Sequence, residues 1–206
     1  MSKKLIAWDK EFPLALKQRQ DLLLRRRQFL MALVKSAVAV PILPLAGALP
    51  GCDKTETKKT DLLTQPPWIT FSVVQEHLFP NDHDGPGAND VNATSYLKFV
   101  LEAPDTDEEE RKFILEGVTW LDGIAEEQKG KAFLKLSFDD QEPVLEKIAD
   151  SRAGGSWLSY LLLYILEALL SDPVYGGNPD GIGWKWLQHQ PGFPRPPYNK
   201  RYTELL

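Results

Sequence analysis

The sequence predicts an all-α fold, a compact helical domain followed by a long irregular C-terminal tail. Two observations predict it. Between residues 68 and 172, apolar side chains recur at helical spacing in successive segments that prolines, glycines and helix caps separate. After Pro173 the periodicity stops, and glycine, proline and aromatic residues dominate.

The first two helices of the domain are expected in "WITFSVVQEHLFP", which Pro80 ends, and in "VNATSYLKFVLE", which Pro104 ends. The loop between them, "NDHDGPGAND", has the composition of a calcium loop. An EF-hand loop needs Asp at its first position, Gly at its sixth and Glu at its twelfth, and neither Gly85 nor Gly87 gives such a register. We therefore predict a solvated turn.

The third helix is expected in "DTDEEERKFILEGVTWLDGIAEEQ". Thr106 and Glu109 have the spacing of a capping box, and the glutamates of the first turn suit the positive end of the helix dipole. Gly117 lies in the apolar stripe and indicates close contact with another helix. The next segment, "AFLKLSFDDQEPVLEKIAD", predicts two short helices that break at Ser137, with Pro143 in the first turn of the second.

The segment "SWLSYLLLYILEALLSDP" is apolar on almost every face. We predict a helix of about 14 residues, capped by Ser156 and ended by Pro173, too short to cross a bilayer and buried by the other helices. Glu167 interrupts the run, either at the rim or beside a partner such as Arg152 or Lys185.

The N-terminal part differs in charge from the rest. Residues 1–60 carry 12 Lys and Arg against 5 Asp and Glu, whereas the remaining residues carry 12 against 24. An acidic body would be repelled by phosphates, so the basic leader indicates targeting and not nucleic-acid binding.

Within the leader, Arg26, Arg27, Phe29 and Leu30 match a twin-arginine export signal, and a weakly apolar run follows them. The alternative is a basic patch before a signal anchor. The only cysteine, Cys52, ends this run in the setting Leu49-Pro50-Gly51-Cys52, which resembles a lipobox; an unlipidated thiol is the alternative. We predict a signal peptide over 1–51, a polar tether over 52–67 and a helical domain over 68–206.

The composition limits the redox chemistry that this chain could perform alone. One cysteine excludes an internal disulfide, a cluster held by several thiolates and a CxxCH haem attachment, and three histidines leave little for a zinc or copper site. We expect no catalytic residue, metal ligand or cofactor in this chain.

Three stretches resemble a known family: "HLFPNDHDGPGANDVNATSYL", "GVTWLDGIA" and "LLSDPVYGGNPDGIGWKWLQHQPGFP". They are similar to the gluconate 2-dehydrogenase subunit 3 family, the small subunits of membrane-associated flavin dehydrogenases, and the tail motif is the specific part. The resemblance implies a noncatalytic subunit that assists maturation and twin-arginine export of a large FAD-binding subunit of the glucose–methanol–choline type. It also implies a sugar or sugar-acid substrate for the complex and, as a third subunit, a multihaem cytochrome c.

The resulting hypothesis is an accessory subunit on the periplasmic side of the bacterial inner membrane, lipid-anchored through Cys52. Its partner interface is expected at Tyr175, Asn178, Trp184 and Trp186, which either contact the large subunit or hold the tail that does. A small periplasmic hydrolase would need a nucleophile and base pair, and no GxSxG is present. A free-standing lipoprotein that binds a ligand or acts as a scaffold is the remaining alternative.

Overall fold

The computed structural model describes residues 2–17, 63, 65–82, 84–197 and 201. Residues 1–13 and 61–206 form one unit; of the second unit, residues 14–60, only 14–17 are described. The described residues contain helices and no strand, which confirms the all-α class. The α-helices are α1 (Lys3–Glu11), α3 (Trp68–Leu78), α4 (Ala93–Glu102), α5 (Glu108–Lys129), α6 (Phe138–Ala149), α7 (Arg152–Leu170) and α8 (Ile182–Trp186), and the short 3₁₀ turns are η2 (Phe133–Lys135), η3 (Pro173–Tyr175) and η4 (Pro179–Gly181).

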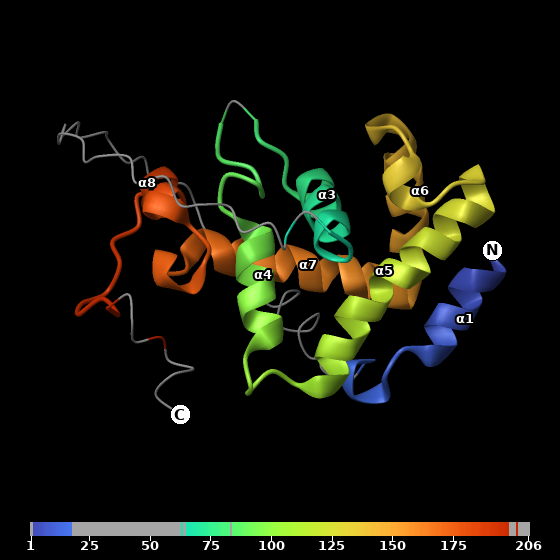
Figure 1. Ribbon diagram of the computed structural model, residues 1–206, viewed down its shortest axis with the longest axis horizontal. Coiled ribbons are helices and arrows are strands. Elements are labelled where there is room, and N and C mark those ends of the chain that lie inside the picture. Colours follow the sequence, from blue (N-terminus) through green and yellow to red (C-terminus); the bar gives the residue numbers. More distant parts are fainter. Residues whose placement is uncertain (1, 18–62, 64, 83, 198–200, 202–206) are drawn as a thin grey trace, which may run out of the picture. The chain divides into compact units, whose positions relative to one another are not determined.

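Helix α7 is the centre of the larger unit. It contacts α1, α3, α4, α5, α6 and α8, and Figure 1 shows α3, α4, α5 and α6 crossing it. Trp157 is fully buried, and its indole N–H donates to the carbonyl of Ile114 on α5 over 2.9 Å. A Cβ on Gly117 would lie 2.0 Å from that indole nitrogen, so the glycine allows α5 and α7 to approach each other. The prediction of close helix contact at Gly117 is confirmed.

The start of α7 differs from the prediction. The helix has 19 residues, and its cap is Ser151, whose hydroxyl accepts the N–H of Gly154. Ser156 lies inside the helix and donates to the carbonyl of Arg152. Glycine is unfavourable inside a helix, but here it lets the first turn of α7 lie against the end of α6: a Cβ on Gly154 would be 2.3 Å from the carbonyl oxygen of Ile148. By length and composition alone, α7 could cross a membrane. Over half of its most apolar 18-residue stretch is buried inside the domain.

The start of α5 also differs in its cap. Asp107 caps the helix, since its carboxylate accepts the N–H groups of Glu109 and Glu110, at 2.9 and 3.2 Å. Thr106 instead donates to the carbonyl of Val100 and so ties the start of α5 to the end of α4. Serine, threonine, aspartate and asparagine all serve as N-caps, so two adjacent candidates cannot be separated by spacing alone.

Helix α1 comes from the segment that the sequence assigns to the signal peptide. Its Leu5 and Trp8, with Phe12 just after it, are at most 2% exposed. They lie against α5 and α7: the Trp8 ring stacks on Trp120 at 6.0 Å between centroids and meets the edge of Trp157 at 6.2 Å. Helix α3 begins at Trp68, where the domain was expected to start. Helix α1, from the beginning of the predicted leader, adds residues to the core of this domain.

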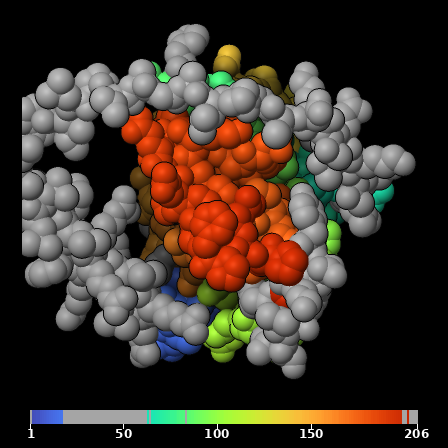
Figure 2. Space-filling view, turned by 90° about the vertical axis from the view of Figure 1, so that its left-hand side faces the viewer, coloured from blue at the N-terminus to red at the C-terminus, as the bar shows by residue number. Residues whose placement is uncertain are grey.

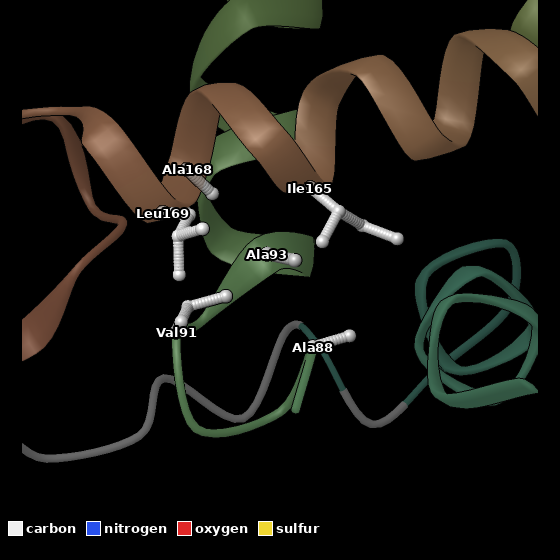
Figure 3. Close-up of a cluster of buried hydrophobic side chains, with 6 residues drawn as sticks. All are labelled: Ala88, Val91, Ala93, Ile165, Ala168 and Leu169. Atoms are coloured by element: carbon white, nitrogen blue, oxygen red, sulfur yellow. The ribbon is translucent and has the colours of Figure 1, made fainter. Parts of the chain in front are cut away.

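A cluster of mostly small buried residues lies where the end of α7 meets the loop before α4. Figure 3 shows this cluster, and its members are Ala88, Val91, Ala93, Ile165, Ala168 and Leu169. Small side chains allow the loop backbone to come close to α7. The same place receives the C-terminal tail, because the N–H of Asn178 donates to the carbonyl of Val91 at 2.9 Å.

Candidate partner interface

The C-terminal tail turns back immediately after α7. Asp172 caps the first 3₁₀ turn through the N–H of Val174 and also binds Arg195, at 2.8 Å from its Nε. Gly176 has φ +93°, a left-handed conformation that favours glycine. A Cβ on Gly177 would lie 2.9 Å from the carbonyl oxygen of Ala168. The paired glycines therefore let the tail double back against the last turn of α7.

Asn178 is completely buried and joins three segments. Its side-chain amide donates to the carbonyl of Ser171 over 2.9 Å, and its side-chain oxygen accepts the N–H of Gly183 over 2.7 Å. Its backbone adopts the left-handed conformation at φ +49°, which asparagine tolerates better than most residues. Asn178 thus holds the tail against α7 and the loop before α4.

Trp184 closes the end of α7. Only 8% of it is exposed, and its indole N–H donates to the carbonyl of Leu170 at 2.8 Å. The last carbonyls of a helix have no partner within the helix, so the bonds from Trp184 and Asn178 satisfy groups that would otherwise be unpaired. The Arg195 guanidinium lies over the ring, 5.1 Å from its centroid.

Trp186 lies on the surface and is 41% exposed. Its indole N–H donates to the carbonyl of Asp84 at 2.5 Å, and its ring meets Phe79 edge-on at 6.3 Å. The ring also covers Gly85, where a Cβ would be only 2.4 Å away. Trp186 therefore joins the tail to the loop between α3 and α4.

In the loop between α3 and α4, the carboxylates of Asp82 and Asp90 accept hydrogen bonds from backbone N–H groups of the loop itself. Asp82 accepts the N–H groups of Asp84 and Gly85, and Asp90 accepts the N–H of Gly87 and a side-chain N–H of Asn81. In the part of the chain that the structure describes, no group of three or more His, Cys, Asp or Glu side chains is placed to hold a metal ion. The loop is a turn, as predicted, but it is solvated only in part, because Pro86, Gly87 and Ala88 are buried.

The tail and the last turn of α7 expose several large apolar side chains. Figure 2 shows the C-terminal segment, in red and orange, across the middle of the face. Besides Trp186, the tail exposes Leu187 at 44% and Phe193 at 87%, and α7 adds Leu170 at 49%. Tyr175 is half-buried, with its ring 5.3 Å from that of Phe99. We define the tail patch as Leu170, Trp186, Leu187 and Phe193.

The four predicted interface residues thus occupy two kinds of place. Asn178 and Trp184 lie inside the domain, where they hold the tail, whereas Tyr175 and Trp186 reach its surface. Sequence reasoning did not assign Leu170, Leu187 or Phe193 to the interface. An apolar residue between prolines, such as Phe193 in "PGFPRPP", has no helix of its own to bury it, and this signal could have found it.

Glu167 has a tyrosine as its partner and not the arginine or lysine that the sequence suggested. The Tyr96 hydroxyl on α4 donates to its carboxylate at 3.1 Å. Burial raises the pKa of Glu167, the hydrogen bond from Tyr96 opposes this, and the charge of Glu110 adds to the rise. Tyr164 donates to Glu110, and burial, followed by this bond, raises the pKa of Tyr164 well above its usual range. These contacts tie α7 to α4 and α5.

The predicted export signal, Arg26, Arg27, Phe29 and Leu30, and the predicted lipidation site, Cys52, lie outside the described residues. They remain predictions from the sequence.

A family model matches residues 67–192, which include α3 to α8 and the tail motif. The chain belongs to the gluconate 2-dehydrogenase subunit 3 family. The name of this family describes a small subunit of an oxidoreductase complex, and the match includes each buried tail residue described above. No curated protein and no solved structure shows a significant match to the chain.

Proposed function

We propose that this chain is a noncatalytic accessory subunit of an exported FAD-dependent dehydrogenase. The large flavoprotein, of the glucose–methanol–choline type, oxidises a sugar or sugar acid of the gluconate kind. This chain binds the flavoprotein, assists its maturation and carries it through the twin-arginine translocase. The chain itself holds no cofactor; FAD belongs to the large subunit and haem c to a multihaem cytochrome as third subunit.

The observation that supports this proposal most is the division of the tail into buried and exposed residues. Asn178 and Trp184 hold the backbone of the tail in place through their hydrogen bonds, and the side chains of the tail patch stay exposed. A binding surface that is ordered before binding loses less entropy on association. Tryptophan and other large apolar side chains commonly contribute most of the affinity of an interface. The tail patch therefore has the character of a docking surface for another subunit.

Export and anchoring complete the proposal. Arg26 and Arg27 would direct the folded pair to the twin-arginine route, and a lipid on Cys52 would hold it at the periplasmic side of the inner membrane. Mass spectrometry of the mature N-terminus tests the second point, with a diacylated or triacylated cysteine as the expected result. An unmodified N-terminus elsewhere would leave a soluble periplasmic subunit.

The decisive experiment is purification of the affinity-tagged full chain from its native cells, with the eluate assayed for a bound flavoprotein. We expect flavin absorbance and sugar-dependent dye reduction in the eluate. The variants Trp186→Ala and Phe193→Ala should each weaken recovery of the flavoprotein, since an anchor of this kind is worth about 2 kcal/mol or more. Phe138→Ala, at a residue 55% exposed on α6, is the matched control and should recover the flavoprotein normally.

Two outcomes would count against parts of the proposal. A wild-type chain that elutes alone would reject the accessory role and favour a free-standing scaffold. Full recovery with both tail variants, at unchanged melting temperature, would keep the accessory role but move the interface away from the tail patch.

A further inference from the structure

Helix α1 packs against both α5 and α7, and we call the surface that it covers there the groove. Leu5, Trp8 and Phe12 follow an i, i+3, i+7 pattern, which places them on one face of a helix. All three are at most 2% exposed. The walls of the groove are aromatic: Phe113 and Trp120 on α5, and Trp157 on α7.

Polar contacts fix the direction and register of α1 in the groove. The Asp9 carboxylate accepts the N–H of Ala153 over 2.7 Å, at the first turn of α7. That N–H has no partner within its helix, and the positive end of the helix dipole favours a carboxylate there. At the other end of α1, the Ser2 hydroxyl caps the helix and donates to Glu127 on α5 over 2.6 Å. The groove therefore accepts a short amphipathic helix with three apolar anchors and one carboxylate.

The helix in the groove is too short to be stable alone. It has nine residues, whereas isolated helices below about 12–15 residues are marginal in water. Its folding is therefore coupled to its docking. Because α1 belongs to the same chain as the groove, its docking is intramolecular, and this advantage ends if the chain between them is cut.

We infer that α1 is a releasable occupant of this groove: the covalent link through residues 14–60 keeps it docked, and a cut in that link releases it and uncovers the aromatic walls. The proposed processing before Cys52 would make such a cut. The inference rests on the proposed function only for the claim that this cut happens during export. Release itself is measured on purified protein and does not depend on that claim.

The test places a site-specific protease sequence between Gln20 and Asp21 of the full chain, so that cutting frees residues 1–20 and leaves the arginine motif with the domain. After cutting, the peptide should leave the domain peak in size-exclusion chromatography at micromolar concentration. The domain should retain its helical circular dichroism while its tryptophan emission moves to longer wavelength, as expected for newly exposed indoles.

A second measurement adds a synthetic peptide of residues 1–17 back to the cut domain. We expect saturable rebinding, about tenfold or more weaker for Trp8→Ala and also weaker for Asp9→Asn. Ile6→Ala is the matched control, since Ile6 lies on the outer face of α1 at 40% exposure, and it should bind like the wild type.

Three results would overturn the inference. A cut peptide that remains with the domain at micromolar concentration would show a permanent subunit of the fold. A cut domain that loses its helical signal would show that α1 is required for folding. Equal binding of the wild-type and Trp8→Ala peptides would show that α1 does not dock through the aromatic groove.

Discussion

At the scale of single residues, Asn178 and Glu167 are the two polar side chains whose burial matters most for the end of the domain. Asn178 satisfies a carbonyl after α7 and an N–H at the start of α8. Glu167 keeps a half-buried carboxylate beside Tyr96 and near Glu110. The first stabilises the fold because its partners would otherwise be unpaired, and the second costs stability when it is ionised.

Replacing Asn178 with alanine should destabilise the domain by about 2–4 kcal/mol, because two backbone groups lose their partner in a largely buried place. Urea unfolding of the full chain measures the change. Gln188→Ala is the control, since Gln188 also has a positive φ, of 52°, but its side chain is exposed. Equal losses for the two variants would mean that the backbone conformation alone matters at Asn178.

Replacing Glu167 with glutamine should raise the melting temperature near neutral pH. The pKa of Glu167 is raised in the fold, so the folded state binds more protons than the unfolded state and stability falls as the pH rises above the ordinary glutamate value. Glutamine removes this loss and can still accept from Tyr96. Screening of the partly exposed group limits the gain to less than about 4 °C.

Melting curves of the wild type and Glu167→Gln at pH 7 and at about pH 4, near the ordinary pKa of glutamate, measure this effect. The difference should shrink at the lower pH. A wild type that is more stable than the variant at neutral pH would contradict the assignment.

At the scale of elements, the sequence located the helices better than it located their ends. The apolar periodicity of residues 68–78 and 108–129 predicted α3 and α5, because a buried stripe leaves a clear period. The caps of α5 and α7 were misassigned: Thr106 and Asp107 are adjacent candidates for α5, and α7 begins at Ser151, before two glycines that pack against α6. Helix α1 was missed because only Leu5 and Trp8 are buried within a charged nine-residue segment, too short for a period to stand out.

The packing of α5 predicts opposite effects for two of its glycines, Gly117 beside α7 and Gly123 beside α1. Gly117→Ala should cost about 1–3 kcal/mol, because the new methyl group meets the fixed indole of Trp157. Gly123→Ala should be neutral or gain roughly 0.5–1 kcal/mol, because its methyl group meets only the flexible end of Lys4 and alanine favours the helix. Thermal unfolding of both variants compares them directly, and a stabilising Gly117→Ala would refute the close packing.

At the scale of the whole molecule, the family and the helical class were predicted correctly from the sequence. The partner interface stays a prediction, and for its residues the sequence could not distinguish buried from exposed side chains. Composition marked the tail as aromatic, yet it could not distinguish Trp184, which packs on α7, from Trp186, which packs on the loop between α3 and α4 and stays 41% exposed. That distinction depends on the left-handed turns at Asn178 and Gly181, which no hydrophobic pattern encodes.

Export should depend on the paired arginines. We expect that Arg26→Lys with Arg27→Lys retains both this chain and its flavoprotein in the cytoplasm, since the large subunit has no signal of its own in the proposed complex. Cell fractionation followed by immunoblotting measures the distribution. Arg25→Lys is the control and should be exported normally; unchanged periplasmic levels of the double variant would reject the twin-arginine assignment.

The closed end of α7 has a consequence for how relatives of this chain are grouped. The tail segment "YGGNPDGIGW" includes residues that pack against the end of α7. These residues leave little side-chain surface for a partner subunit to contact. We expect that a sequence search with this segment finds chains whose tail packs on the last turn of α7 in the same way, whatever dehydrogenase each chain accompanies. We expect partner preference to depend instead on exposed side chains such as Leu187 and Phe193, so substrates across the group should be assigned by comparing the exposed positions and not the segment itself.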